Sequence, residues 1–386
     1  MMDYMAIVCE DLFRSMKMSY IWNNSDWPSF IYKDKLISQQ YEDYLLQKRA
    51  TDIVLSIIDP DMRERMHARS LTHEIQASLE IEGESISYDS VYSSICQRLD
   101  IPLEKKTKTD RYAESISNLV LDATGNLQVL SHDRINEWHT FLFNAMAGIK
   151  PKLIGAYRQE PVYINKGNLR QEELIYEGVP AERIPREMER LIAFINEENE
   201  HKPLIKSAIA SLWFLCIHPY EDGNGRISRA IADYVLSKGF HETHRVYSMS
   251  TLILKNRGKY YQLLYEISSQ SASLDITQWL LWHIEIAIQA KQEALKEYEK
   301  SVMLTRFMKN LDPSIFNSRQ LSMLYKLADG SFAGKLTTYK WAKMNTCSPA
   351  AASRDIQQLL QKGLLIPSGD TGPKIGYYLN PNILEK

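Results

Sequence analysis

Residues 216–229, with the sequence CIHPYEDGNGRISR, bring several chemically active side chains into one short stretch. They include a histidine, two acids, two glycines, an asparagine and two arginines, and they follow the strongly apolar segment IASLWFLCI. Polar groups at this density, directly after an apolar segment, indicate a functional site.

The glycines and arginines of this stretch suit a phosphate group. A glycine-rich loop that leads into a helix offers free backbone N–H groups and the positive end of the helix dipole. Gly223 and Gly225 let the backbone approach a ligand closely. Arg226 and Arg229 lie one helical turn apart and can hold further oxygens with their forked donors. The spacing therefore favours a polyphosphate chain.

His218 and Asp222 supply the remaining chemistry, as a candidate general base and as a hard oxygen ligand for Mg²⁺. An EF-hand is excluded, because a loop with Gly225 in sixth place would put Tyr220 and Ile231 at the first and last ligand positions. A Walker phosphate loop is excluded because the sequence has no GxxxxGK[ST] motif. A purely structural interpretation, with a capping histidine and ordinary ion pairs, leaves the concentration of phosphate-suited groups unexplained.

The composition is that of a globular protein of two or three domains. Its 386 residues are 44% hydrophobic, and 46 Lys and Arg balance 48 Asp and Glu to a net charge of −2, so global charge indicates no partner. Four scattered cysteines indicate neither a zinc site nor a disulfide framework. The sequence lacks signal-peptide features and long apolar runs, so we expect a cytoplasmic protein without a membrane anchor.

The elements around the polar stretch are expected to be mainly α-helical. Residues 61–82 favour a helix that stops at Gly83, and Pro203 suits the first turn of a buried helix that is apolar nearly all round. After the loop, residues 226–239 read as a helix stopped by Gly239. Residues 153–178 alternate and contain glycines, which predicts a β-hairpin within this helical region.

The sequence HPYEDGNGRISR resembles the signature of the Fic family, H-P-F-x-D/E-G-N-G-R-x-x-R, with Tyr220 in place of the usual phenylalanine. GAYRQEPVYI upstream is similar to the family's flap hairpin, and NRGKYYQLL downstream to the helix after the motif. The resemblance covers roughly residues 110–295. YIWNNSDWPSF near the start also resembles a domain often fused ahead of bacterial Fic cores.

The resemblance implies transfer of AMP from ATP to a hydroxyl group of a target protein or of the chain itself. By position, His218 would deprotonate the hydroxyl and Asp222 would hold Mg²⁺. Gly223, Asn224 and Gly225 would line the anion cradle. The outer phosphates would be bound by Arg226 and Arg229.

Two further groups of residues match the nucleotide side of the family's site. Tyr260 and Tyr261 correspond to an aromatic pair beside the adenine, although a pair on a helix face is as readily part of a core. In the flap, Ile164, Asn165 and Lys166 fall where the family approaches adenine and aligns the target segment as an added strand. Related enzymes use other diphosphate donors, so ATP is inferred from the resemblance alone.

SLEIEG, residues 78–83, resembles the family's autoinhibitory motif, which runs from Ser78 to Glu82 and Gly83. By this resemblance Glu82 would pair with Arg229 and make ATP bind unproductively. A surface helix with a C-terminal glycine would explain the same six residues. In some inhibited members the glutamate supports removal of AMP, and the sequence does not decide whether that happens here.

The C-terminal part, LTTYKWAKMNTCSPAAASRDIQQLLQKGLL and the hairpin-like residues after it, resembles a winged helix-turn-helix. Ser348 would start its recognition helix, and Arg354 would lie on that helix as a contact to DNA or to a partner protein. Residues 331–386 hold seven basic and three acidic residues, a balance that assists approach to DNA but that solvated surfaces also show.

These features predict a mainly α protein with three domains: an N-terminal helical domain at 1–109, a Fic core with a hairpin flap at 110–300, and a winged-helix domain at 312–386. Two functions of different class follow. The first is an AMP transferase inhibited by Glu82, and the alternative is a DNA-binding transcriptional regulator that senses ATP. An intact His218 favours the first, because a sensor needs no base. A homodimer is the default assembly.

Overall fold

The computed structural model describes residues 20–103, 110–168, 171–198, 200–269, 273–328, 332, 335–370 and 375–383. It divides into two compact units, Met1–Gln292 and Glu293–Lys386. Helices dominate both units, so the predicted mainly α class is confirmed. No helix among these described residues is long and apolar enough to cross a membrane.

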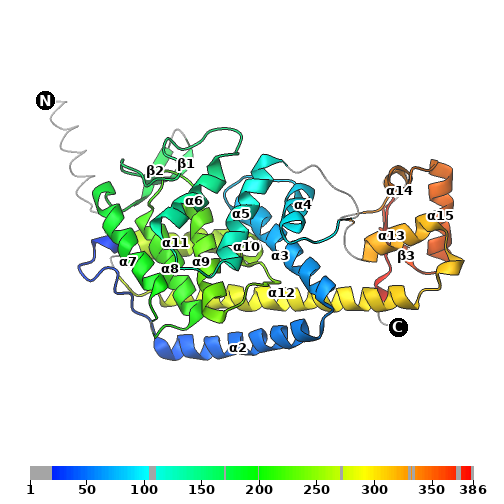
Figure 1. Cartoon of the computed structure of the whole chain (residues 1–386), viewed down its shortest axis with the longest axis horizontal. Coiled ribbons are helices and arrows are strands. Elements are labelled where there is room, and N and C mark those ends of the chain that lie inside the picture. Colours follow the sequence, from blue (N-terminus) through cyan, green and yellow to red (C-terminus); the bar gives the residue numbers. More distant parts are fainter. Residues whose placement is uncertain are drawn as a thin grey trace. The chain divides into compact units, whose positions relative to one another are not determined.

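The first unit is built around two helices that meet at the polar loop (Figure 1). Its other elements surround them or pack at one side. In chain order they are η1 (Ile21–Asn23), α2 (Asp34–Ile57), α3 (Pro60–Ile81), α4 (Tyr88–Arg98), α5 (Arg111–Gly125), α6 (His132–Phe143), β1 (Tyr163–Asn168), β2 (Gln171–Glu177), η2 (Ala181–Arg183), α7 (Ile184–Asn196), α8 (Pro203–Ile217), α9 (Asn224–Phe240), α10 (Met249–Lys255), α11 (Arg257–Ser269) and the start of α12 (Thr277–Asn310).

The central helix α8 is buried on nearly every side, as its apolar sequence predicts. Its serines let α9 approach closely: Ser207 donates a hydrogen bond to the Ala232 carbonyl, and Ser228 of α9 donates to the Ser211 carbonyl. Trp279 of α12 donates to the Ala208 carbonyl from another side. These contacts satisfy buried polar groups and fix the position of the loop between α8 and α9.

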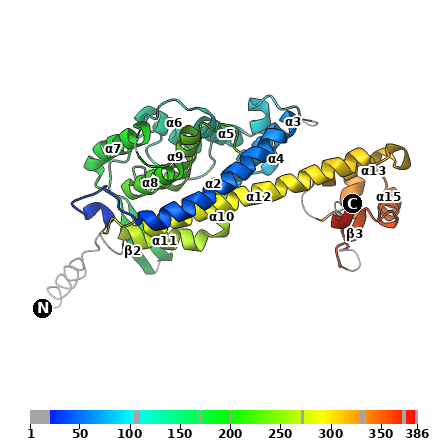
Figure 2. The same cartoon turned by 90° about the horizontal axis from the view of Figure 1, so that it is seen from below.

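The helix predicted at 61–82 is α3, which begins after the N-cap Asp59 and ends at Ile81. Gly83 follows in the left-handed region, with φ of +85°, as the predicted stop requires. Figure 2 shows α2 running beside the first part of α12. Lys291 of α12 lies over the ring of Tyr44 of α2, with Nζ 5.7 Å from the ring centroid.

The structure corrects the predicted end of α9. The helix continues through Gly239 to Phe240, and His241 caps it in the left-handed conformation with φ of 52°. Gly239 serves packing instead, because a Cβ there would lie 2.6 Å from Cβ of Pro203 at the start of α8. Gly239 therefore allows close contact between α9 and the start of α8, and the prediction that it ends the helix was wrong.

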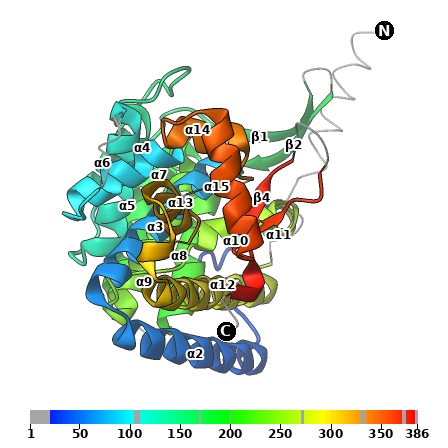
Figure 3. The same ribbon diagram turned by 90° about the vertical axis from the view of Figure 1, so that its right-hand side faces the viewer.

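The predicted β-hairpin is present as β1 and β2, which pair antiparallel from Tyr163↔Glu177 to Asn168↔Gln171. The register is irregular between Ile164 and Asn165. The hairpin extends away from the helices of its unit (Figure 3).

The second unit, which contains the end of α12, has three further α-helices followed by a short hairpin among its described residues. After η3 (Pro313–Ile315) come α13 (Ser318–Ala328), α14 (Thr338–Met344), α15 (Pro349–Gln361), β3 (Leu365–Pro367), β4 (Tyr377–Leu379) and η5 (Pro381–Ile383). Trp341, Ile356 and Leu365 belong to its own apolar core. Arg319 and Trp341 both donate to the carboxylate of buried Asp355, which joins the three helices.

Candidate active site

His218 lies at the C-terminal end of α8, where φ and ψ of 54° and 58° place it in the left-handed conformation. Its Nδ1 lies 3.2 Å from the Leu215 carbonyl oxygen, an acceptor, so Nδ1 carries the proton and donates. Burial and the charge of Arg158 lower the pKa of His218 to about 4. The imidazole is therefore neutral at pH 7, and its Nε2 is the nitrogen that can accept a proton.

Asn224 fixes the shape of the loop between α8 and α9. Its side-chain nitrogen donates to the Tyr220 carbonyl at 2.8 Å, and its side-chain oxygen accepts from the Tyr220 N–H at 3.0 Å. Because both ends of the amide are used within the loop, Asn224 acts by shaping the cradle with its buried side chain.

Tyr220, the departure from the family signature, is fully buried and its hydroxyl is satisfied. The hydroxyl donates to Asn136 at 2.8 Å, and the ring stacks on His139 with centroids 4.0 Å apart. His139 Nδ1 accepts from the Gly155 N–H at 3.0 Å, so Nε2 carries the proton and donates to the Asp222 carbonyl at 3.2 Å. The tyrosine thus keeps the aromatic anchor of the loop and adds a hydrogen bond.

Gly223 and Gly225 open the N-terminus of α9. Gly223 has φ of +83°, and a Cβ there would lie 2.9 Å from the Phe143 ring. A Cβ on Gly225 would strike the carboxylate oxygen Oε1 of Glu82. The carboxylate therefore lies directly on the cradle, where the first-turn N–H groups and the helix dipole favour an anion.

Arg226 and Arg229 extend from the first two turns of α9 and are almost completely buried. Arg229 donates from Nε to the Ser78 hydroxyl at 2.9 Å and from Nη2 to the Ser78 carbonyl at 2.8 Å. Within the described part of the chain, Nε of Arg226 and Nη1 of Arg229 are buried without a hydrogen-bond partner. Unsatisfied cationic donors beside a helix N-terminus suit a polyanionic ligand.

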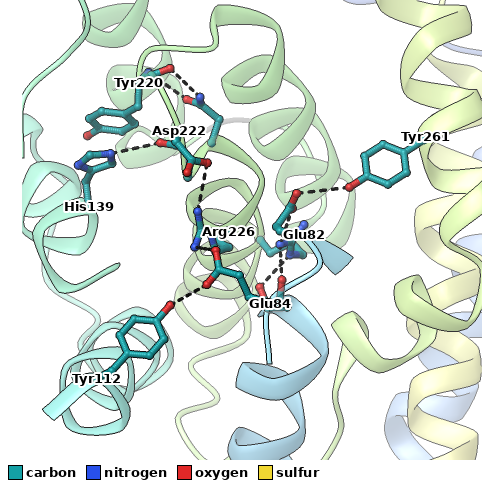
Figure 4. A network of polar contacts seen from close by, with 12 residues as sticks. Glu82, Glu84, Tyr112, His139, Tyr220, Asp222, Arg226 and Tyr261 are labelled. Carbon is teal, nitrogen blue, oxygen red and sulfur yellow. Dashed lines mark hydrogen bonds and ion pairs between the residues drawn. The ribbon is translucent and has the colours of Figure 1, made fainter. Parts of the chain in front are cut away.

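Glu82 makes the contact predicted for it, with Oε1 2.9 Å from Nη2 of Arg229 (Figure 4). Its other oxygen accepts from the Tyr261 hydroxyl at 3.3 Å. Burial raises the pKa of Glu82, but the charge and hydrogen bond of Arg229 outweigh it and the pKa lies below its usual value. The carboxylate is consequently ionised at neutral pH and competes with any anion for Arg229.

A cleft of about 850 Å³ opens beside these groups, within the range of small-molecule sites. The predicted residues that line it are Ile164, His218, Gly225, Tyr260 and Tyr261, together with Glu82. The two tyrosines differ, because Tyr260 is buried against Trp279 and Trp282 whereas Tyr261 is 40% exposed. Asn165 and Lys166 pair with Leu174 and Glu173 in the hairpin, and their side chains lie outside the described residues.

Asp222 is the predicted metal ligand of this loop. Its carboxylate is 58% exposed and accepts from Nη2 of Arg226 at 3.1 Å. One exposed carboxylate beside an anion cradle fits Mg²⁺, which binds phosphates through few protein ligands and keeps several waters. The described residues contain no cluster of three or more His, Cys, Asp or Glu side chains suited to a metal.

Arg158 was not predicted, although it positions His218. It is buried, and it donates from Nε to the His218 carbonyl at 2.8 Å, from Nη1 to the Glu160 carbonyl at 2.8 Å and from Nη2 to the Val179 carbonyl at 2.6 Å. Its backbone N–H donates to the Pro219 carbonyl. No local pattern marks an arginine that binds backbone carbonyls sixty residues away, so the sequence held no signal for it.

We expect Arg158→Lys to lower the stability of the first unit by about 2 kcal/mol, because a single ammonium cannot serve the three carbonyls and leaves buried acceptors unpaired. Thermal unfolding of the variant measures this loss. The matched control is Arg186→Lys, since Arg186 is exposed on α7. Equal unfolding midpoints for the two variants would contradict the role of Arg158.

The buried histidines of the first unit predict its response to acid. Burial lowers the pKa of His67, His139, His218 and His283 to about 4. The unfolded chain binds protons near pH 6.5 and the native chain does not, so stability is lost as pH falls from about 6.5 to 4. Each histidine contributes up to about 1.4 kcal/mol per pH unit. Urea unfolding at pH 7 and pH 5 checks this, and equal midpoints would contradict it.

Ser348 and Arg354 belong to the second unit and are not part of the cleft's unit. The Ser348 hydroxyl accepts from the Ala351 N–H at 3.2 Å, so it caps α15 as the sequence suggested. Arg354 is exposed on α15, on the side away from the buried Ile356 and Leu359.

Comparison with known proteins defines the class of the domain. The sequence model of the Fic/DOC family matches residues 129–236, which include the loop, α8 and most of α9. A domain of unknown function, DUF4172, matches residues 20–101. The chain therefore contains a Fic/DOC domain at residues 129–236, and the resemblance seen in the sequence is confirmed over these residues.

Individual relatives agree with this assignment. A Fido domain-containing protein of Dictyostelium discoideum is 31% identical over 93 residues, which are 22% of this chain and 57% of that protein, so the match spans little more than half of the relative. The crystal structure of a Fic family protein from Desulfovibrio desulfuricans G20 aligns with a TM-score of 0.53 and 20% identity, covering 89% of this chain and 96% of that chain. At 20% identity, the similarity to the Desulfovibrio desulfuricans structure shows a shared fold alone.

Proposed function

We propose that this chain transfers AMP from ATP to a hydroxyl group of a protein, and that Glu82 holds the resting enzyme inactive. The Fic domain supports a transferase-type activity in general. One observation carries the finer proposal: His218, whose Nδ1 donates to the Leu215 carbonyl and whose Nε2 is left as an acceptor, lines the same cleft as Gly225 at the N-terminus of α9.

In the proposed reaction the target hydroxyl oxygen attacks the α-phosphorus of ATP. The new bond joins that oxygen to phosphorus, the bond from the α-phosphorus to the bridging oxygen breaks, and pyrophosphate leaves with the electron pair. The hydroxyl proton passes to Nε2 of His218. Mg²⁺ held by Asp222 would neutralise phosphate charge, and Arg226 and Arg229 would hold the outer phosphates in line for the attack.

The inhibited state follows from the position of Glu82. Its carboxylate lies against Gly225 and pairs with Arg229, so it competes with the terminal phosphate for the same cationic and N–H donors. ATP that binds beside it would lack one phosphate contact and would be poorly oriented. The flap would accept the target segment as an added strand along β1.

The proposed reaction is tested by determining which part of ATP is transferred to protein. The Glu82→Gly variant is incubated with Mg²⁺, a whole-cell protein extract and ATP labelled at either the α or the γ position. AMP transfer predicts protein label from the α position alone. Label from the γ position would mean phosphoryl transfer and would overturn the proposal.

The second unit supports a separate candidate function, DNA binding. Ser353, Arg354, Gln357 and Gln361 of α15 are exposed, and such side chains can hydrogen-bond base edges in a major groove. If the Fic domain only senses ATP for this unit, the affinity for DNA changes with ATP while His218→Ala has no effect on function. A gel-shift titration with and without ATP decides between the two.

A further inference from the structure

Two carboxylates flank Gly83 at the end of α3, and the motif assigned from sequence explains one of them. The helix ends in a Schellman motif, in which the Glu84 N–H donates to the Leu79 carbonyl and the Gly83 N–H to the Glu80 carbonyl, each at 3.0 Å. The left-handed Gly83 turns the chain, so Glu82 and Glu84 point to different arginines of α9.

Glu84 contacts Arg226 as closely as Glu82 contacts Arg229. Its Oε1 lies 2.5 Å from Nη1 of Arg226, and its Oε2 accepts a hydrogen bond from the Tyr112 hydroxyl of α5 at 3.0 Å (Figure 4). The side chain of Arg226 is 3% exposed and that of Glu84 is 22% exposed. An ion pair this close and this shielded is stronger than an ordinary surface pair.

Arg226 is engaged on two sides. Nη1 contacts Glu84, Nη2 contacts Asp222 at 3.1 Å, and the guanidinium lies over the Phe143 ring at 5.0 Å. Glu82 does not make this contact with Arg226: its ion pair is with Arg229. Removing Glu82 therefore frees one arginine of the cradle and leaves the other occupied.

We propose that Glu84, held by Tyr112, is a second inhibitory carboxylate that keeps Arg226 from the phosphates of ATP. This inference rests on the proposed function, because it assigns Arg226 to the outer phosphates. Full access to the cradle then needs both ion pairs to open. Tyr112 belongs to α5, so the position of Glu84 depends on the packing of α5 beside the end of α3, whereas the contacts of Glu82 are with Arg229 and Tyr261.

Nucleotide binding measures this contact without any transfer reaction. ATP and AMP are titrated by calorimetry, with Mg²⁺, into His218→Ala protein that carries Glu84 or Glu84→Gln. Glutamine keeps the side-chain shape and removes the charge. We expect Glu84→Gln to tighten ATP binding about tenfold, the worth of one charged hydrogen bond, and to leave AMP binding within twofold, because AMP lacks the outer phosphates.

Two further variants are titrated with ATP in the same way, one as a control for the lost charge and one to test the role of Tyr112. Glu80→Gln removes the same charge from the exposed side of the same helical turn, and should change ATP affinity less than twofold. Tyr112→Phe keeps Glu84 but removes the hydroxyl that holds it, and should tighten ATP binding in the same direction as Glu84→Gln by a smaller factor. Equal ATP affinities for Glu84→Gln and Glu80→Gln would overturn the proposal.

The outcomes separate this inference from the proposed function. In one outcome, Glu84→Gln raises the affinity for ATP but not for AMP while Glu82→Gly transfers no AMP. In that case Glu84 does keep Arg226 from the phosphates, and the transferase proposal fails. If Glu82→Gly transfers AMP while Glu84→Gln changes neither ATP affinity nor the transfer rate of Glu82→Gly, the transferase stands and the role of Glu84 is refuted.

Discussion

Replacing Glu82 by glycine is expected to raise AMP transfer about tenfold to a hundredfold. The substitution removes the carboxylate that touches Gly225 and pairs with Arg229 at 2.9 Å. A hydrogen bond to a charged group is worth about 1.5–3 kcal/mol, which sets the size of the shift toward the active state. Arg229 keeps both of its bonds to Ser78, so it stays oriented in the cradle.

Initial rates of AMP incorporation from α-labelled ATP measure this activation. The control is Glu80→Gly, which places a glycine in the same turn of α3 at an exposed position. It should leave the rate at the wild-type level, because it loosens the helix without removing the ion pair. Equal rates in Glu82→Gly and wild type would show that Glu82 does not inhibit.

Replacing His218 by alanine in the Glu82→Gly protein is expected to lower transfer at least about a hundredfold, the usual contribution of a general base. ATP affinity should change little, because Gly223, Gly225 and the arginines of α9 remain. The separation of rate from binding distinguishes a base from a residue that shapes the nucleotide site.

The chain offers a matched control for that variant. His241 also ends a helix in the left-handed conformation, with φ of 52° against 54° for His218, but it is exposed. His241→Ala reproduces the backbone change alone and should retain full transfer. A loss of activity in His241→Ala equal to that in His218→Ala would contradict a specific role for His218.

The sequence predicted those parts of the fold that local patterns determine. The apolar surface of α8, the alternation in the hairpin and the Gly83 stop of α3 each have a local physical cause, and each is present. Gly239 shows the limit of such patterns. A glycine that makes room for Pro203 looks the same in sequence as a glycine that ends a helix.

The site could be predicted where its functional residues lie close together in the sequence. The cradle glycines and His218 lie within one loop, and the match of Ser78 and Glu82 to a known motif pointed to Arg229, which both contact. Glu84 stands beside that motif in the acid–glycine–acid sequence EGE and was overlooked because the motif ends at Gly83.

Long-range partners of the site could not be read from the sequence. Arg158 reaches backbone carbonyls, which no side-chain pattern encodes, and Tyr112 meets Glu84 only because α5 packs beside α3. Asn224 suited a ligand by residue type, but the structure shows its amide bound to the backbone of Tyr220. Such contacts depend on tertiary packing and not on spacing along the chain.

The role of His218 in AMP transfer is tested most directly by comparing three proteins under one condition: Glu82→Gly, Glu82→Gly with His218→Ala, and Glu82→Gly with His241→Ala. Each is incubated with α-labelled ATP, Mg²⁺ and the same protein extract. We expect equal protein labelling in the first and third proteins and at most about one hundredth of that labelling in the second. Equal labelling in all three would contradict an AMP transferase that uses His218 as its base.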